Sequence, residues 1–247
     1  MTKLSVNVNK IATLRNARGG DVPSVLEAVS VCVAAGVPGI TIHPREDERH
    51  IRASDVKDIA AFLADVRDTV EFNIEGGPRA DLIERVLQIR PHQCTLVPVR
   101  PGEITSEAGW APETDPVGLG AIVRRLQAEG IRVSLFVEAR PAAITWAASV
   151  GADRVELYTE PYARAFGTSE ESLVVASYAD ASQQAAGLGM GVNAGHDLDL
   201  DNLGRFLAAV TGVDEVSIGH ALISTAIFRG LAATVEAYLE ITRRAPV

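Results

Sequence analysis

The chain alternates between short β-rich runs and helical patterns, with a period of about 30 residues. Eight consecutive βα units in 247 residues predict an α/β fold, a closed parallel (β/α)8 barrel that forms a single domain over residues 1–247. A doubly wound open sheet would give the same alternation. Its dinucleotide fingerprint is absent, however, because Arg18-Gly19-Gly20-Asp21 lacks the glycine spacing. The predicted strands lie near residues 4–8, 39–43, 70–75, 93–98, 132–137, 154–158, 191–193 and 215–218.

Polar or ionisable residues stand at the C-terminal ends of almost all these runs. In a closed barrel every one of those ends lies on the same rim, so residues far apart in sequence would share one pocket. His92 lies at the start of the fourth run, and we expect it on the opposite face with a structural role. The strand-end residues are Asn7, Asn9, His43, Arg45, Glu75, Glu138, Glu156, Tyr158, His196 and His220.

Four connections are long enough to contribute to such a pocket. Residues 9–20 read as a loop with three cations, which suits an anion, and residues 43–50 combine two histidines and two arginines. Residues 99–116 have the length of a lid, and residues 159–168 form a similar, shorter loop.

Local signals mark the ends of several predicted helices. Asp21 and Pro23 are placed to open the first helix, and Gly36 to close it. Thr168 and Glu171 have the spacing of a capping box, so a helix is expected to start at Thr168.

Charge and cysteine content limit the classes of partner. A formal net charge of −9 argues against non-specific binding to nucleic acid or anionic membranes, so anionic ligands must be held by local arginines and backbone amides. No apolar run reaches the roughly 18 residues of a membrane span, and no signal-type segment is apparent at the N-terminus. Cys32 and Cys94 are expected to be buried, reduced thiols, which favours a cytoplasmic location.

Four stretches of the chain, residues 6–19, 39–51, 192–196 and 218–221, together carry a specific resemblance. On them the chain resembles the pyridoxine 5′-phosphate synthase family of vitamin B6 biosynthesis over essentially its whole length. The resemblance implies condensation of 1-deoxy-D-xylulose 5-phosphate with 3-amino-2-oxopropyl phosphate, with release of inorganic phosphate and water. It also implies that no metal or organic cofactor is needed and that the chain forms a symmetric homo-octamer.

The resemblance assigns catalytic roles to four of the strand-end residues. It implies that His43 is a general base, Glu75 a second proton acceptor and His196 a general acid, while Glu156 stabilises a charged transition state. Imine formation, phosphate elimination and ring closure each move protons, so several groups that titrate near neutrality are expected around one substrate.

The resemblance also assigns two sets of ligand contacts. Arg18, Arg45, His50 and Thr105 match positions that hold the deoxyxylulose phosphate, and arginine suits phosphate oxygens. Asn7 matches the position that contacts the aminoketone. Gly219 and His220 follow the eighth predicted strand, where barrels often bind phosphate through backbone N–H groups.

The chain departs from the family pattern at two places. Asn9 and Lys10 stand where many members have Asp-His, so ligand contacts there are expected to persist with a different pH dependence. Asp197 stands where the family usually has glycine, and a carboxylate near a phosphate is unfavourable unless it points away.

Two other classes of function stay open at this point. A phosphosugar aldolase or isomerase would need a Schiff-base lysine or a metal cluster, and no lysine occupies an inner strand position. A non-catalytic relative that binds phosphorylated ligands would be favoured by the absence of His43, Glu75 or His196, and all three are present.

Overall fold

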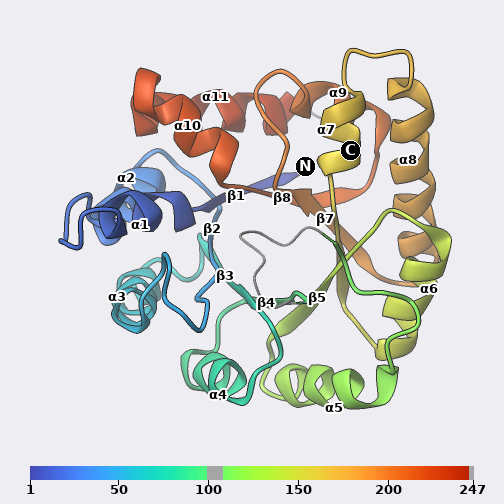
Figure 1. Ribbon diagram of the computed structural model, residues 1–247, viewed down its shortest axis with the longest axis horizontal. Coiled ribbons are helices and arrows are strands. Elements are labelled where there is room, and N and C mark those ends of the chain that lie inside the picture. Colours follow the sequence, from blue (N-terminus) through green and yellow to red (C-terminus); the bar gives the residue numbers. More distant parts are fainter. Residues whose placement is uncertain (99–107, 245–247) are drawn as a thin grey trace.

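Eight parallel strands close into one barrel in the computed structural model, which describes residues 1–98 and 108–244. Each strand pairs with the next one along the chain, and β1 pairs with β8, which distinguishes the closed barrel from an open sheet. Figure 1 shows the helices as a ring around these strands. The strands are β1 (Lys3–Asn7), β2 (Gly39–Ile42), β3 (Glu71–Gly76), β4 (Gln93–Leu96), β5 (Arg132–Val137), β6 (Arg154–Leu157), β7 (Gly191–Gly195) and β8 (Val213–Ile218).

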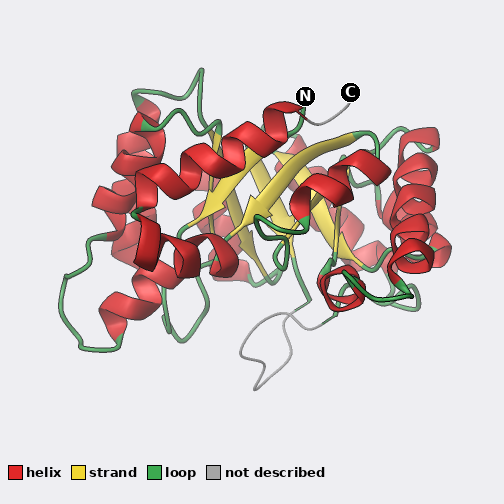
Figure 2. Ribbon diagram, turned by 90° about the horizontal axis from the view of Figure 1, so that it is seen from above, coloured by secondary structure: helices red, strands yellow, loops and turns green. Residues whose placement is uncertain are grey.

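Helices cover the outer face of the barrel on all sides, and the strands lie between them in the side view (Figure 2). None of the described helices has both the length and the apolar character needed to cross a membrane. The helices are α1 (Asn9–Asn16), α2 (Val25–Ala34), α3 (Ala53–Ala64), α4 (Ala80–Ile89), α5 (Pro116–Gln127), α6 (Pro141–Val150), α7 (Glu160–Ala165), α8 (Glu171–Gly187), α9 (Leu203–Ala209), α10 (His220–Arg229) and α11 (Leu231–Arg244).

Two segments that were predicted to be loops contain helices instead. In the 9–20 segment, α1 forms because Ala12 and Arg15 are buried at helical spacing, and the Val8 carbonyl accepts the first helical N–H groups. In the 159–168 segment, Pro161 opens α7, which buries Tyr162 completely. The cations in the first segment and the shortness of the second concealed the burial of these residues. Most of the predicted lid, residues 99–107, falls outside the described residues.

Two predicted helix starts are wrong by a few residues. The first long helix, α2, begins after Ser24, whose side chain accepts the Glu27 N–H, and not at Asp21 or Pro23. The helix expected at Thr168 begins at Glu171, because Thr168 caps the N–H of Glu170 while the Glu171 carboxylate accepts the N–H of Gly167. Each correction shifts a boundary and leaves the order of elements unchanged.

The hydrophobic core lies between the barrel wall and the surrounding helices. Alternate strand residues such as Leu4, Val6, Ile40 and Ile42 are fully buried and belong to this core. Their neighbours along each strand point to the other face, which is the barrel interior. The two faces of each strand therefore serve different purposes, packing outside and polar chemistry inside.

The barrel interior is polar, unlike the branched apolar filling that is usual for this fold. Asn193 of β7 donates to Gln93 of β4 at 3.2 Å, and Gln93 donates to Glu215 of β8 at 3.5 Å. These strands are not neighbours in the sheet, so the hydrogen bonds cross the interior. Because most polar groups there have partners, their burial is tolerated.

His92 occupies the structural position expected from the sequence. Its Nδ1 accepts the Phe72 N–H at 2.9 Å, so in the neutral ring Nε2 carries the proton and donates to the Arg67 carbonyl at 3.1 Å. The imidazole thus ties the start of β4 to the start of β3 and to Arg67 before it, on the face away from the C-terminal strand ends.

The end of β7 needs glycine for steric reasons. Gly195 has a positive φ of 154°, and a Cβ atom there would lie 2.0 Å from the Ser217 carbonyl oxygen of β8. The next residue, His196, also has a positive φ, of 54°, which is uncommon for a residue with a side chain. Its backbone N–H donates to Ser217 at 2.9 Å, which holds the turn.

We predict that Gly195→Ala destabilises the fold by about 2 kcal/mol or more, because the methyl group forces β7 and β8 apart. Denaturant titration measures this loss. Gly118→Ala in α5 is the matched control, since its Cβ meets nothing within 4 Å and the change should be neutral or stabilising by up to about 1 kcal/mol. Equal midpoints for Gly195→Ala and the parent would contradict the steric argument.

Candidate active site

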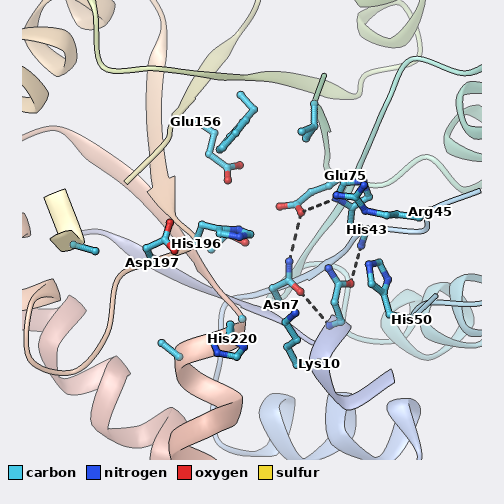
Figure 3. A pocket seen from close by; sticks show the side chains of 17 residues that line it. Asn7, Lys10, His43, Arg45, His50, Glu75, Glu156, His196, Asp197 and His220 are labelled. Carbon is cyan, nitrogen blue, oxygen red and sulfur yellow. Dashed lines mark hydrogen bonds and ion pairs between the residues drawn. The ribbon is translucent and has the colours of Figure 1, made fainter. Parts of the chain in front are cut away.

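A cavity of about 440 Å³ opens where the C-terminal ends of the strands meet. The predicted pocket therefore exists, and all the residues proposed for catalysis line it (Figure 3). The cavity is lined by Asn7, Asn9, Lys10, His43, Arg45, His50, Glu75, Val97, Phe136, Glu156, Ala163, His196, Asp197, Ser217, Gly219, His220 and Ala221.

Three of the described residues that the sequence suggested for the pocket, namely Arg18, Glu138 and Tyr158, are not among those lining the cavity. Arg18 follows the end of α1 and is exposed to solvent. Glu138 stands at a strand end but pairs with Arg140 at 2.6 Å, and Tyr158 contacts the Phe136 ring. Thr105 lies outside the described residues. Position at a strand end therefore selects candidates, and the direction of the side chain decides among them.

The ends of β1, β2 and β3 are joined by two asparagines. The Asn9 N–H donates to Asn7 Oδ1 at 3.0 Å, and the His43 N–H donates to Asn9 Oδ1 at 2.9 Å. Asn7 also donates to Glu75 Oε2 at 3.4 Å. Asn9 thus supplies the acceptor that aspartate would supply at this position, while its amide nitrogen adds a donor.

His43 and Glu75 meet in the middle of the cavity, with His43 Nδ1 3.8 Å from Glu75 Oε2. Burial, reinforced by the nearby Arg45 cation, lowers the pKa of His43 well below its ordinary value. Burial and the Glu215 carboxylate raise the pKa of Glu75 to about 8, against the opposing effect of Arg45. At pH 7 the contact therefore joins a neutral imidazole to a mostly protonated carboxyl group.

Glu156 approaches the same space from β6 (Figure 3). Burial raises its pKa well above the ordinary value, and the Glu75 and Glu215 carboxylates add to the shift. Glu156 Oε2 and His43 Nε2 are buried without a hydrogen-bond partner in the described part of the chain. Unpaired buried polar atoms are costly, so their presence beside a cavity marks a place where a ligand can bond.

Two further histidines are held in the neutral form. Burial lowers the pKa of His50 to about 4, with Arg45 and Lys10 adding to the effect. Burial also lowers the pKa of His196 to about 4, again with help from Lys10. Desolvation and neighbouring cations both disfavour imidazolium, so these histidines have pKa values below neutrality, whereas Glu75 and Asp197, with pKa values of about 8 and 6, are groups that titrate near neutrality.

The β8 side of the cavity is formed by backbone. Gly219 lies so close to β1 that a Cβ atom there would be 3.1 Å from the Asn7 Cβ. His220 is the first residue of α10, and the N–H groups in the first turn of a helix have no acceptor within it. An anion can bind such a helix end without meeting a side chain.

Asp197 lies beside this region, with Oδ2 buried and unpartnered among the described residues. Burial and the Glu160 carboxylate raise its pKa to about 6, although His220 opposes the shift. The aspartate therefore exchanges its proton in the physiological range, which lessens its repulsion of an anion below that pH.

Sequence reasoning missed several lining residues, namely Val97, Phe136, Ala163, Ser217 and Ala221. Phe136 and Ser217 could have been found, since each is the next-to-last residue of its strand and shares a face with inward-pointing neighbours. Val97, Ala163 and Ala221 carry no polar signal in the sequence.

We predict that Glu75→Gln gains stability relative to the parent as pH rises. The folded pKa of about 8 lies above the ordinary 4.5, so the stability from protonated Glu75 is complete below pH 4.5 and is lost as pH rises through 8. Glutamine cannot ionise, so the free energy of unfolding of Glu75→Gln should rise relative to that of the parent by a few kcal/mol between about pH 5 and 8. Denaturant titrations at both pH values measure the gain.

Glu71, on the same strand, is the matched control. Burial there is outweighed by Lys3 and Arg132, which lower its pKa to about 2, so its contribution is lost only as pH falls below 4.5. The difference between Glu71→Gln and the parent should stay constant between about pH 5 and 8. A constant difference for Glu75→Gln as well would show that Glu75 is already ionised in the folded chain.

Comparison with solved structures shows the fold. Thiamine phosphate pyrophosphorylase from Pyrococcus furiosus aligns with a TM-score of 0.64 at 13% identity, covering 99% of this chain and 97% of the other. 3-Keto-L-gulonate-6-phosphate decarboxylase from Vibrio cholerae aligns with a TM-score of 0.65 at 10% identity, covering 100% and 99%. At such low identity these similarities concern the barrel alone.

Comparison with characterised sequences is more specific. The chain is 51% identical to pyridoxine 5′-phosphate synthase of Bacteroides thetaiotaomicron over 243 residues, which cover 98% of this chain and 100% of the relative. It is 52% identical to the protein of the same name from Xanthomonas oryzae pv. oryzae, with coverage of 100% and 98%. The family model described as pyridoxal phosphate biosynthesis protein PdxJ matches residues 4–244, and the chain belongs to this family.

Proposed function

We propose that the chain is a pyridoxine 5′-phosphate synthase, which condenses 1-deoxy-D-xylulose 5-phosphate with 3-amino-2-oxopropyl phosphate and releases inorganic phosphate and water. Family membership over residues 4–244 and relatives of this name at about half identity support the proposal. The observation that carries the chemistry is the meeting of a neutral imidazole, His43, with a protonated carboxyl group, Glu75, at 3.8 Å in a cavity of suitable size.

His43 acts as the general base in this proposal. Its low pKa keeps the ring unprotonated at pH 7, so it is ready to accept a proton. Glu75 is mostly protonated in the empty cavity, but the amine of the aminoketone arrives as an ammonium ion. A nearby cation lowers a carboxyl pKa, so binding of this substrate makes Glu75 the second proton acceptor.

His196 acts as the general acid, and binding of the substrates gives it the proton that this role needs. A ring with a pKa of about 4 holds little proton at pH 7, yet a bound phosphate dianion stabilises imidazolium and raises that pKa. His196 is therefore protonated, and able to act as an acid, only when ligand is bound. Glu156, on the neighbouring strand β6, stabilises positive charge that develops during ring closure.

The two phosphate groups bind in neighbouring parts of the cavity, one formed by residues that follow β1 and β2 and the other by residues that follow β8. Lys10, Arg45 and His50 form the cationic side, where the deoxyxylulose phosphate binds through charge-assisted hydrogen bonds. Gly219 and His220 form the backbone side, where the first turn of α10 holds the aminoketone phosphate. Asn7 and Asn9 contact the substrates between the two sides, and Asp197, whose Oδ2 is buried and unpartnered among the described residues, lies beside the backbone side.

Contacts from Thr105 stay a prediction, because this residue lies outside the described part of the chain. Arg18 does not reach the cavity of its own chain and has no role in the proposal.

The proposed assembly is a symmetric homo-octamer in the cytoplasm, and the family supports both. Subunit contact is favoured by apolar side chains at the end of α10, where Ile227 is 68% and Phe228 is 90% exposed, and by Leu14 on α1. Light scattering on the purified protein measures the mass directly, and a monomer would contradict the octamer.

Incubation of the pure protein with both substrates tests the function, with product followed by its chromophore. His43→Ala and Glu75→Gln should each lower turnover by about 10²-fold or more, because each removes a positioned acid or base, while substrate affinity changes much less. Glu138→Gln is the matched control, since it removes a carboxylate at a strand end outside the cavity. Equal losses of affinity and turnover would assign His43 and Glu75 to binding.

Lys10 gives a second test. It is a permanent cation at neutral pH, so Lys10→Ala should weaken deoxyxylulose phosphate binding by about 1–3 kcal/mol and aminoketone binding less. With Lys10→His in its place, affinity should vary more steeply between about pH 6 and 8. Calorimetric titration measures both, and Lys57→Ala on the exposed face of α3 is the control. If Lys10→Ala binds both ligands as tightly as the parent does, Lys10 is only a solvated cation and has no role in binding.

A further inference from the structure

A buried ion pair lies just behind the cationic side of the cavity. Arg15 of α1 donates to both carboxylate oxygens of Asp55 in α3, at 2.5 and 2.9 Å, and both residues are buried. Neither side chain lines the cavity, and neither has a part in the proposed chemistry. A bidentate arginine–carboxylate pair fixes direction as well as distance, so it orients α1 relative to α3.

The same two residues also hold the loop between β2 and α3, residues 43–52. Arg15 donates a further hydrogen bond to the His50 carbonyl at 3.0 Å, and Asp55 accepts the Arg52 N–H at 2.7 Å. Asn16 adds a second donor to the His50 carbonyl at 2.8 Å. Groups outside the loop therefore hold its last turn by hydrogen bonds at two points, the His50 carbonyl and the Arg52 N–H.

His50 is fixed in its ring as well as in its backbone. Its Nδ1 accepts the N–H of Ile51 at 2.9 Å, so in the neutral ring the proton is on Nε2. The ring packs edge-on against His43, with 6.2 Å between the ring centres. A neutral N–H donor in a fixed direction can bond a phosphate oxygen without carrying charge.

We infer that the Arg15–Asp55 ion pair is a positioning device for deoxyxylulose phosphate, acting through the 43–52 loop that carries Arg45 and His50 into the cavity. The inference rests on the proposed function of that side of the cavity. The pair touches no substrate. It holds the loop in the bound geometry before the ligand arrives, which removes the entropic cost of ordering the loop on binding.

The double variant Arg15→Met/Asp55→Asn tests the inference, because it removes both charges and leaves no buried ion unpaired. Asparagine at position 55 retains an acceptor for the Arg52 N–H. The KM for deoxyxylulose phosphate should rise about tenfold or more, while kcat and the KM for the aminoketone change by less than about threefold. A purely structural role would lower the melting temperature and leave the ratio of the two KM values unchanged.

Arg205→Met/Glu171→Gln is the matched control. This pair, at 2.9 Å, also joins two helices, α9 and α8, and Glu171 also accepts a backbone N–H, from Gly167, before its helix. Both KM values should stay at the parent level. An unchanged KM for deoxyxylulose phosphate in a folded Arg15→Met/Asp55→Asn protein overturns the inference.

Two further measurements keep the outcome decisive. If the double variant does not fold, Asn16→Ala removes the other donor to the His50 carbonyl, and a rise of about threefold in the same KM supports the inference while no rise overturns it. If the parent forms no pyridoxine 5′-phosphate, the proposed function fails. Calorimetric titration of parent and variant with deoxyxylulose phosphate alone then decides the positioning role, which weaker binding by the variant supports and equal binding overturns.

Discussion

Pairing of the first strand with the last is the constraint on which the rest of this molecule depends. β1 and β8 pair in parallel through Leu4 with Val216 and Val6 with Ile218. This pairing closes the barrel and brings Asn7 against Gly219, so that the helices following both strands begin at one cavity. An open sheet with the same eight strands would leave those helix ends on opposite edges. Closure thus places the first residues of α1 and α10 at one pocket, where the proposed function puts two phosphate groups.

Desolvation sets the protonation states inside that pocket. It raises the pKa of Glu75 and lowers those of His43 and His196, so at pH 7 Glu75 is mostly protonated and these two imidazoles are neutral. In the proposed function, the phosphate and ammonium groups of the substrates oppose both shifts. In the proposed function, substrate binding therefore changes the protonation of Glu75 and His196 in the directions that their roles require.

The sequence was sufficient for the fold and for most of the pocket, because both follow from regular spacing. Strands of alternating pattern have polar residues at their C-terminal ends, and in a parallel barrel those ends must converge, which placed His43, Glu75 and His196 together. The resemblance to a family then supplied the roles. Glu138 shows the limit of spacing alone, since the same position on its strand faces outward to Arg140.

Other features depend on contacts that no local pattern encodes. α1 was not predicted, because its segment is rich in cations and its buried residues pack against elements that are distant in sequence. The Arg15–Asp55 ion pair, for example, spans 40 positions. The low pKa values of the histidines arise from the summed burial and charge of several strands. Spacing predicts which side chains are neighbours, whereas protonation depends on how much water those neighbours exclude.

The placement of the cavity at the closing seam has a consequence for synthesis of the chain on the ribosome. Asn7 is made more than 200 residues before its neighbours Gly219 and His220. Domains generally fold as units while they emerge, but this pocket is incomplete until β8 has joined β1. Ligands of this pocket therefore cannot stabilise a nascent chain by mass action until β8 has been made and has paired with β1.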